Sequence, residues 1–355
     1  MSRSAENSGT IEVRKAHRFD TARLEEWMRN EVADFEGPLS IVQFKGGQSN
    51  PTYRLDTPHR SYVMRRKPPG KLLPGAHAVD REYRVISALH AQNFPVARPL
   101  GLCTDSDVIG TEFYVMDMVE GRIFWEASLP EVPAGARWSY FDAMNATIAS
   151  LHAFDPFAIG LGEYGKPGNY FERQIGRWSK QYLNDAEAGR VAAMDRLVEW
   201  LPANIPPGED EARIIHGDYR CDNMIFHPTE PRIIAVLDWE LSTLGHPLAD
   251  FAYHLMMYRM PTGITAGLAG LDLAAQGIPS ERDYVAAYCA RTGRAGIPHL
   301  DFYIAFNMFR LAAIIHGIKG RLARGTASSA HAEKTVAGLE GLADLAWAQA
   351  VKAGA

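Results

Sequence analysis

The spacing of hydrophobic side chains changes along the chain and separates a β-rich region from a helical one. Short apolar or alternating runs predict strands over residues 39–44, 52–55, 62–66, 97–103 and 112–119. Apolar residues at helical spacing predict helices over residues 20–35, 79–92, 136–153 and 169–200 and from about residue 248 onward, with a β-like segment at 213–238. This order predicts an α+β protein with a small β-rich N-terminal lobe and a larger helical C-terminal lobe.

The length of the chain supports a division into two lobes. Its 355 residues exceed the size at which a single hydrophobic core keeps growing. We expect residues 1–18 to be a mobile N-terminus, residues 19–118 to form the N-terminal lobe and residues 119–355 to form the C-terminal lobe. Asp20 is expected to cap the first helix.

The composition argues against several classes of protein. The net charge of −5 gives no support for a nucleic-acid or membrane-surface protein, because both usually show an excess of basic residues. No run reaches the roughly 18 apolar residues of a spanning helix, and the polar N-terminus lacks the apolar core of a signal peptide. The three cysteines form no CxxC pair, so neither a disulfide framework nor a zinc site is indicated. We therefore expect a cytoplasmic protein.

A hairpin is predicted within residues 213–240. Residues 224–226 and 233–237 have the apolar character of strands and are separated by a turn. Asn223 directly precedes the first strand, and Asp238 directly follows the second. Because a hairpin begins and ends at the same edge, we expect Asn223 and Asp238 to lie side by side. Oxygen ligands of this kind suit Mg²⁺ that is bound together with the phosphates of a nucleotide.

Another carboxylate, Asp218, comes five residues before Asn223 in the run His216-Gly217-Asp218. It is then one loop away from the end of the hairpin, where it could accept a proton from a substrate hydroxyl or orient that hydroxyl. Each element also has a plainer explanation: His-Gly-Asp could be a tight turn, and Asp238 could be a helix cap. The ordered set, with the hairpin between its parts, favours the catalytic interpretation.

This layout resembles the kinase catalytic loop, in which Asn follows a His-x-Asp by five residues and a metal-binding Asp comes after a hairpin. The HGDxxxxN form, with Asp238-Trp239 in place of Asp-Phe-Gly, is similar to the aminoglycoside phosphotransferase family. The resemblance implies a protein-kinase-like fold, a nucleotide-binding N-terminal lobe, a catalytic and acceptor-binding C-terminal lobe, and ATP and Mg²⁺ as cofactors. It further implies that Asp218 is the catalytic base, that Asn223 and Asp238 hold Mg²⁺, and that His216 is structural.

Three runs look most like one branch of this family, the kinase domains found next to acyl-CoA dehydrogenases or fused with them. They are RRKPPG at residues 65–70, HGDYRCDN at residues 216–223 and LDWE at residues 237–240.

The same resemblance implies that Arg65 and Glu82 act in nucleotide binding. Arg65 stands on the strand where these enzymes carry a phosphate-gripping residue, usually Lys, for which Arg is a bidentate but not equivalent replacement. Glu82 borders the apolar face of its helix, where a carboxylate needs a partner, and the resembling fold pairs it with Arg65. A solvated basic strand end and a plain surface glutamate are the respective alternatives.

Two further segments resemble nucleotide-contacting parts of the family. The turn at residues 46–50 resembles the loop over the phosphates, and the residues expected to contact the nucleotide there are Gly46, Gly47 and Ser49. Residues 114–121 resemble the hinge between the lobes, where the backbone of Asp117 and Val119 would read the adenine edge with Met116 behind it. An ordinary hairpin turn would have the same sequence pattern as residues 46–50, and simple core packing would explain the apolar residues of 114–121 equally well.

The segment after the hairpin departs from the family in one position. His246 stands in Gly245-His246-Pro247 where many relatives have Gly-Asp-Pro, and the sequence leaves open a contact between His246 and substrate. Asp250 is expected to cap a helix and to brace the catalytic loop.

The class of phosphoryl acceptor is inferred from the balance of charged residues in the C-terminal helical region. Between residues 251 and 320 four acids stand against six bases, in an otherwise apolar segment; they are Asp272, Glu281, Asp283 and Asp301, and Arg259, Arg282, Arg291, Arg294, Arg310 and Lys319. Aminoglycosides are polycations whose pockets need clustered carboxylates, so this balance favours a neutral or anionic acceptor. The branch resemblance implies a hydroxyacyl-CoA.

The function predicted from these features is Mg²⁺-ATP-dependent transfer of the γ-phosphoryl group to a hydroxyl of a small molecule. An antibiotic kinase and a catalytically inactive nucleotide-binding scaffold are the two alternatives. The sequence leaves open the oligomeric state and whether GTP replaces ATP.

Overall fold

The protein divides into two compact units. The structure is a computed structural model that describes residues 8–45, 50–70, 77–208, 211–262, 267–326 and 332–355. The first unit comprises residues 1–125, 157–162 and 222–242, and the second comprises residues 126–156, 163–221 and 243–355. The segment 222–242 therefore belongs to the first unit and not to the C-terminal lobe, where the sequence pattern had predicted it.

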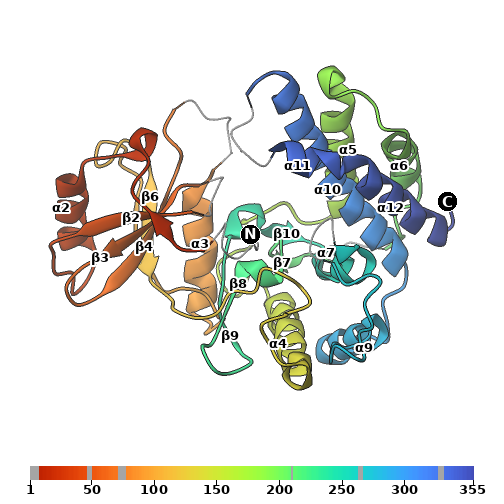
Figure 1. The fold of residues 1–355 in the computed structure, drawn as a ribbon, viewed down its shortest axis with the longest axis horizontal. Helices are drawn as coiled ribbons and strands as arrows, with labels where there is room; N and C mark the ends of the chain where they lie inside the picture. The colour runs from red at the N-terminus through yellow and green to blue at the C-terminus, as the bar shows by residue number, and fades with distance from the viewer. Residues whose placement is uncertain (1–7, 46–49, 71–76, 209–210, 263–266, 327–331) are drawn as a thin grey trace. The chain divides into compact units, whose positions relative to one another are not determined.

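The first unit is built on a six-stranded antiparallel sheet (Figure 1). Its strand order is β1 (Thr10–Ile11), β2 (Ser40–Phe44), β3 (Thr52–Asp56), β4 (Ser61–Arg66), β6 (Phe113–Asp117) and β5 (Pro99–Cys103). The pairing of β1 with β2, and the η1 turn at Lys15–His17, structure part of the N-terminus that the sequence analysis expected to be mobile.

Two helices cover the two faces of this sheet. Helix α2 (Thr21–Glu31) is capped by Asp20, whose carboxylate accepts from the backbone N–H groups of Ala22 and Arg23, as predicted. It buries Leu24 and Met28 against alternate strand residues, which are Tyr53, Leu55, Tyr62 and Met64. Helix α3 (Val79–His90) packs against β5 and β6 and meets the opposite face, on which Arg65 lies.

A hairpin completes the first unit. Strands β8 (Met224–Phe226) and β9 (Ile233–Val236) pair antiparallel, as the apolar pattern predicted. The backbone of Phe226 exchanges hydrogen bonds with Arg122, at 2.8 Å in both directions. Gly121 is required for this approach, because a Cβ there would lie 2.2 Å from the carbonyl oxygen of Phe226. Two short turns flank the hairpin, η3 (Cys221–Asn223) and η4 (Trp239–Leu241).

The second unit is mainly helical. Its helices are α4 (Ala134–Ala153), α5 (Tyr170–Asn184), α6 (Ala192–Ala203), α7 (Pro247–Arg259), α9 (Glu281–Thr292), α10 (Leu300–Ala323), α11 (Ala332–Ala337) and α12 (Leu339–Lys352), with a turn η2 at Ala186–Ala188. A two-stranded ribbon joins β7 (Arg213–Ile215) to β10 (Thr243–Gly245). Helix α10 packs against α5, α7 and α12, which explains why its sequence is apolar around most of its circumference.

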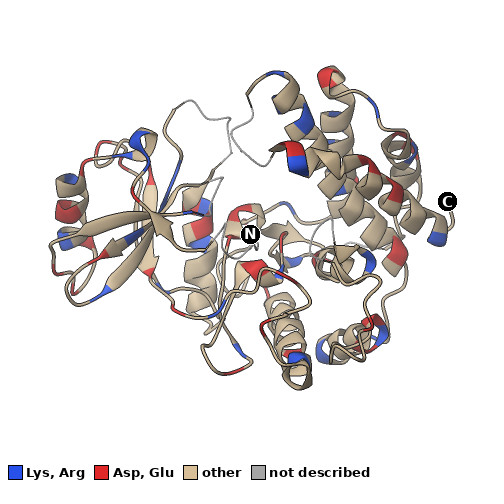
Figure 2. Cartoon of the chain, in the orientation of Figure 1, with Lys and Arg blue, Asp and Glu red and all other residues tan. Residues whose placement is uncertain are grey.

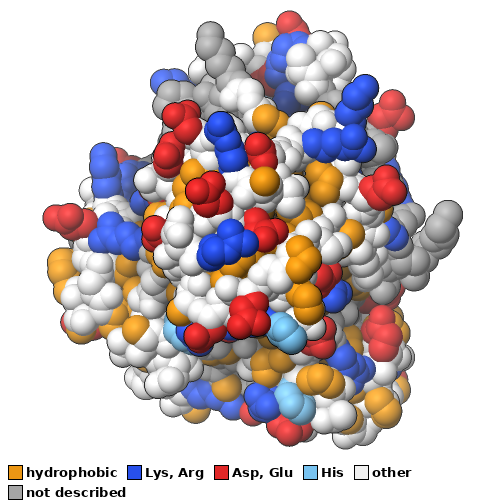
Figure 3. Space-filling view, turned by 90° about the vertical axis from the view of Figure 1, so that its left-hand side faces the viewer, with side chains coloured by type: hydrophobic (Ala, Val, Ile, Leu, Met, Phe, Trp, Pro, Cys, Tyr) orange, Lys and Arg blue, Asp and Glu red, His pale blue; other side chains and the backbone are white. Residues whose placement is uncertain are grey.

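Charged residues are mixed along both units. Figure 2 shows acidic and basic residues on the same helices, and Figure 3 shows acidic, basic and hydrophobic side chains interspersed on the face that it presents. This distribution differs from the continuous basic surface that nucleic-acid binding uses. In the part of the chain that the structure describes, no helix combines the length and the hydrophobicity needed to cross a bilayer.

Candidate functional site

Arg65 lies at the centre of a buried charge cluster in the first unit. Its side chain extends from β4, and the residue is only 8% exposed. Its Nε atom lies 2.9 Å from Glu82 Oε2, its Nη2 atom lies 2.6 Å from Asp238 Oδ1, and Glu240 Oε2 is 3.5 Å away. The expected ion pair between Arg65 and Glu82 is therefore present, and the solvated strand end is not what the structure shows.

The fork of the guanidinium explains why an arginine serves at this position. It binds Glu82 through one nitrogen and Asp238 through another, whereas a lysine would offer a single nitrogen. Burial alone would lower the pKa of Arg65, but the carboxylates of Glu82 and Asp238 raise it above its ordinary value. Arg65 therefore stays charged and is suited to contacts with anions.

Two residues that the sequence analysis did not identify hold Glu82. The Asn50 amide donates to Glu82 Oε1 at 2.8 Å, and the Tyr114 hydroxyl donates to Oε2 at 3.1 Å. Burial raises the pKa of Glu82, while the charge of Arg65 and these two hydrogen bonds oppose that shift. The register places Tyr114 directly opposite Arg65 on the neighbouring strand, so correct strand pairing would have revealed it.

The open end of the hairpin brings Asn223 and Asp238 to one edge, as predicted. Met224 pairs with Val236, and the Leu237 N–H donates to the Asn223 carbonyl at 2.8 Å. Among the described residues no group of three or more His, Cys, Asp or Glu side chains could hold a metal by itself. One carboxylate and one amide oxygen fit Mg²⁺, which binds few protein ligands and takes the rest from phosphates and water.

The remaining nucleotide-contacting predictions have different outcomes. Gly46, Gly47 and Ser49 lie outside the described residues. In the hinge segment Met116 and Val119 are partly buried, and the N–H of Asp117 donates to the Arg98 carbonyl at 2.9 Å. Because the Asp117 N–H is already hydrogen-bonded within the protein, the expected contact of the Asp117 backbone with adenine would have to use its carbonyl group.

In the second unit, Asp250 holds the loop that carries Asp218. Its Oδ2 accepts from the backbone N–H of His216 at 2.8 Å, and its Oδ1 accepts from the N–H of Gly217 at 2.7 Å. The Asp218 N–H in turn donates to His216 Nδ1 at 3.2 Å. Asp250 therefore braces the loop as expected, and His216, which is fully buried, has a structural role.

His152 completes this brace. Its Nε2 lies 3.2 Å from Asp250 Oδ2, and its Nδ1 lies 2.8 Å from the Tyr288 hydroxyl. Burial would raise the pKa of Asp250, but the hydrogen bond and charge of His152, with His216, lower it. Asp250 is therefore an ionised acceptor at neutral pH.

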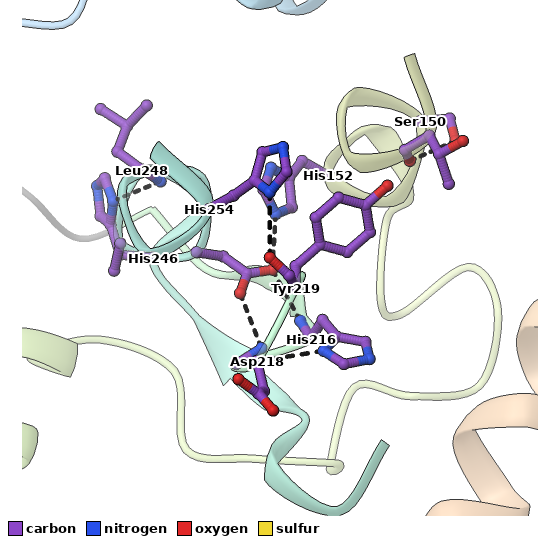
Figure 4. A network of polar contacts seen from close by, with 12 residues as sticks. Ser150, His152, His216, Asp218, Tyr219, His246, Leu248 and His254 are labelled. Carbon is purple, nitrogen blue, oxygen red and sulfur yellow. Dashed lines mark hydrogen bonds and ion pairs between the residues drawn. The ribbon is translucent and has the colours of Figure 1, made fainter. Parts of the chain in front are cut away.

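The structure assigns the helix cap to His246 rather than to Asp250. His246 is 1% exposed, and its Nδ1 accepts from the Leu248 N–H at 3.2 Å at the start of α7 (Figure 4). Its ring stacks on Tyr303 at a centroid distance of 5.9 Å. A buried, capping imidazole has no surface for a substrate, so the contact that we left open for His246 is not supported.

A buried histidine on α7 is expected to make the free energy of unfolding depend on pH. His254 Nδ1 lies 3.1 Å from the Tyr219 carbonyl, to which it must donate, so Nε2 accepts from the Tyr284 hydroxyl at 2.7 Å. Burial lowers the pKa of His254 to about 4. The unfolded chain takes up a proton near pH 6.5 and the folded chain does not, so this contribution is present above pH 6.5 and is lost as the pH falls towards 4.

We expect the free energy of unfolding to fall by about 1.3 kcal/mol between pH 7.5 and pH 5.5 on account of His254 alone. Urea titrations at the two pH values measure it, with His254→Gln expected to lack this component. His59→Gln, which changes an exposed histidine, is the control and should keep the wild-type pH dependence. An unchanged pH dependence in His254→Gln would contradict the assignment.

Comparisons with known proteins agree on one family. The family model described as phosphotransferase enzyme family matches residues 40–288. Acyl-CoA dehydrogenase family member 11 of Gallus gallus is 47% identical over 330 residues, which are 90% of this chain and 42% of that protein. Member 10 of Mus musculus is 41% identical over 97% of this chain and 32% of its own length. The chain thus spans less than half the length of these relatives.

Solved structures show the same fold. A Ralstonia eutropha protein assigned by name to the aminoglycoside phosphotransferases is 52% identical, with a TM-score of 0.86 over 94% of this chain and 99% of that one. Spectinomycin phosphotransferase, solved with ADP and spectinomycin, has a TM-score of 0.62 at 12% identity over 93% and 98% of the two chains. The latter likeness supports the fold alone.

Proposed function

Because the chain belongs to the phosphotransferase enzyme family, we propose that it is a kinase that transfers the γ-phosphoryl group of Mg²⁺-ATP to a hydroxyl of a small molecule. The observation that carries this proposal is the charge cluster of Arg65 with Glu82 and Asp238. Phosphoryl transfer in the kinase template needs a basic side chain that is paired with a helix carboxylate and a metal-binding aspartate nearby, and Arg65, Glu82 and Asp238 supply these groups.

Each residue of the proposed site has its own part in the reaction. In the proposed reaction Asp218 orients the acceptor hydroxyl and takes its proton, and Arg65 offsets the charge of the nucleotide phosphates. Asn223 and Asp238 would hold Mg²⁺, which when bound neutralises phosphate charge.

ATP is proposed as the donor on two grounds. The family is one of phosphotransferases. The related fold of spectinomycin phosphotransferase was solved with ADP, and that of a hygromycin-binding relative with AMP-PNP.

The acceptor is proposed to be neutral or anionic, with an apolar part. Each of the four acids between residues 251 and 320 has a hydrogen-bond partner within the second unit. Glu281 and Asp301 bind Arg259, Asp283 binds Ser280 at the start of α9, and Asp272 accepts from a backbone N–H. Carboxylates that are used in this way are poorly placed to form the cluster that a polycationic aminoglycoside needs.

A hydroxyl group on an acyl-CoA is the specific acceptor that we propose. The similarity to acyl-CoA dehydrogenase family members 10 and 11 supports this choice, because the names of those relatives refer to acyl-CoA substrates. The alternatives remain an antibiotic kinase, which the names of the structural relatives favour, and an inactive nucleotide-binding scaffold.

The test is ADP release from Mg²⁺-ATP over a panel of acceptors. The panel contains 4-hydroxyacyl-CoA and 3-hydroxyacyl-CoA thioesters, the free hydroxy acids, an aminoglycoside, a macrolide, choline and homoserine. We expect release that depends on a hydroxyacyl-CoA and disappears when EDTA removes Mg²⁺. A matched acyl-CoA without the hydroxyl should give only background release.

The other outcomes separate the alternatives. Release with the aminoglycoside or the macrolide, but not with the thioesters, would establish an antibiotic kinase. Mg²⁺-dependent ATP binding without release on any acceptor would favour the scaffold and overturn the proposed reaction.

A further inference from the structure

Helix α7 contacts the loop of Asp218 at two positions one turn apart. Asp250 accepts from the backbone N–H groups of His216 and Gly217, as described above. Three residues later on the same helix, the Tyr253 hydroxyl donates to Asp218 Oδ1 at 2.5 Å. Residues three apart lie on one helical face, so one rigid element holds both the backbone of the loop and the side chain of Asp218.

Tyr253 is itself fixed from the other side. It is 8% exposed, and the guanidinium of Arg310 lies over its ring at 5.5 Å from the centroid. Arg310 also donates to the Gly217 carbonyl at 2.9 Å, so α10 supports the same loop. Helices α7 and α10 therefore both hold the Tyr253 ring next to the loop that carries Asp218.

The phenol acts as a donor throughout the physiological pH range. Burial, and next the neighbouring Asp218 carboxylate, raise the pKa of Tyr253 well above its ordinary value. Arg220 Nε lies 3.3 Å from the same Oδ1 atom. Both contacts converge on one of the two carboxylate oxygens, which sets the rotation of the carboxylate about its side-chain bonds.

We propose that Tyr253 is a positioning residue for Asp218, whose carboxylate it holds through Oδ1 in the orientation that serves the acceptor hydroxyl. This inference rests on the proposed function of Asp218 as the base. A carboxylate that can rotate spends less time in the productive orientation, and a misplacement of about 1 Å can cost on the order of 100-fold in rate.

The experiment compares wild type with Tyr253→Phe, Asp218→Asn and the double variant. With the best acceptor of the panel, we expect Tyr253→Phe to lower kcat by about 10- to 100-fold while the KM for ATP stays within about twofold. In the Asp218→Asn background, the same substitution should change kcat by less than about twofold. Such non-additivity shows that Tyr253 acts through Asp218, since a merely structural loss would be the same in both backgrounds.

Tyr258→Phe is the matched control. Tyr258 lies on the same helix, is 7% exposed, and its hydroxyl has no hydrogen-bond partner among the described residues. We expect its kcat to equal that of wild type. Equal effects of Tyr253→Phe and Tyr258→Phe, or full additivity with Asp218→Asn, would overturn the inference.

A second measurement does not depend on the acceptor. Crystal structures of wild type and Tyr253→Phe with Mg²⁺ and AMP-PNP should show one Asp218 orientation in the former and more than one in the latter. An unchanged single orientation in Tyr253→Phe would refute the positioning role. Absence of turnover in wild type on every acceptor would instead refute the proposed function, and the two failures are thus distinguishable.

Discussion

Replacing Asp218 by asparagine is expected to lower turnover by about 10²- to 10⁴-fold with little change in ATP affinity. The amide keeps the shape of the side chain but cannot take the proton of the acceptor hydroxyl. The bracing of the loop by Asp250 runs through the backbone of His216 and Gly217, so the substitution should leave the loop in place. Initial rates of ADP release at saturating ATP and acceptor measure the loss, and equilibrium binding measures ATP affinity.

The control for this prediction is Asp272→Asn, which removes a carboxylate from a surface turn of the same unit. Its turnover should match that of wild type. Near-normal turnover in Asp218→Asn would contradict the assignment of Asp218 as the base. A residue that only shapes the loop could be replaced by an isosteric amide without loss of turnover.

Replacing Arg65 by methionine is expected to destabilise the protein by about 3–5 kcal/mol and to weaken ATP binding. The substitution leaves Glu82, which is 1% exposed, with a buried charge whose cationic partner is gone. It also removes the cation next to Asp238. Urea unfolding measures the stability change, and isothermal titration with Mg²⁺-ATP measures the affinity.

A double variant separates the two effects. In Arg65→Met/Glu82→Gln the buried position is neutral, so part of the stability should return while ATP affinity stays low. Arg54→Met on the neighbouring strand breaks a partly exposed pair with Asp56 and should cost less than about 1 kcal/mol. Equal stability losses in Arg65→Met and Arg54→Met would show that the cluster is not the buried unit described here.

The residues on which the stability of the first unit is expected to depend are therefore also those proposed to bind the nucleotide. Arg65 holds α3 to β4 through Glu82 and reaches the end of the hairpin through Asp238. The same side chain that closes the unit is the one proposed to bind phosphate. The phosphates of a nucleotide that binds there must compete with Asp238 for the Arg65 guanidinium. Because Asp238 is also the proposed Mg²⁺ ligand, Mg²⁺ would take up that carboxylate as the phosphates take up the guanidinium. We therefore expect Mg²⁺ and phosphate to bind together.

Much of the local architecture followed from the sequence because it depends on contacts between near neighbours. Alternation of apolar residues fixed the strands β2, β3 and β4, and the cap at Asp20 fixed the start of α2. The turn between two apolar runs predicted the β8–β9 hairpin, and thereby placed Asn223 and Asp238 at the same edge, although the irregularity in the register at Ile225 and Phe226 was not predicted.

The sequence also determined the family, since the ordered set of Asp218, Asn223 and Asp238 is carried by spacing alone, and the family model confirms it. Tertiary structure decided which partners these residues have. Arg65 and Asp238 are 173 residues apart, and Tyr253 and Asp218 are 35 apart, distances over which no periodicity carries information. His246 shows the same limit. Its position in a family motif leaves a substrate contact open, and the packing of its ring against Phe171 of α5 and Tyr303 of α10 shows a buried cap, because burial is a property of the assembled helices.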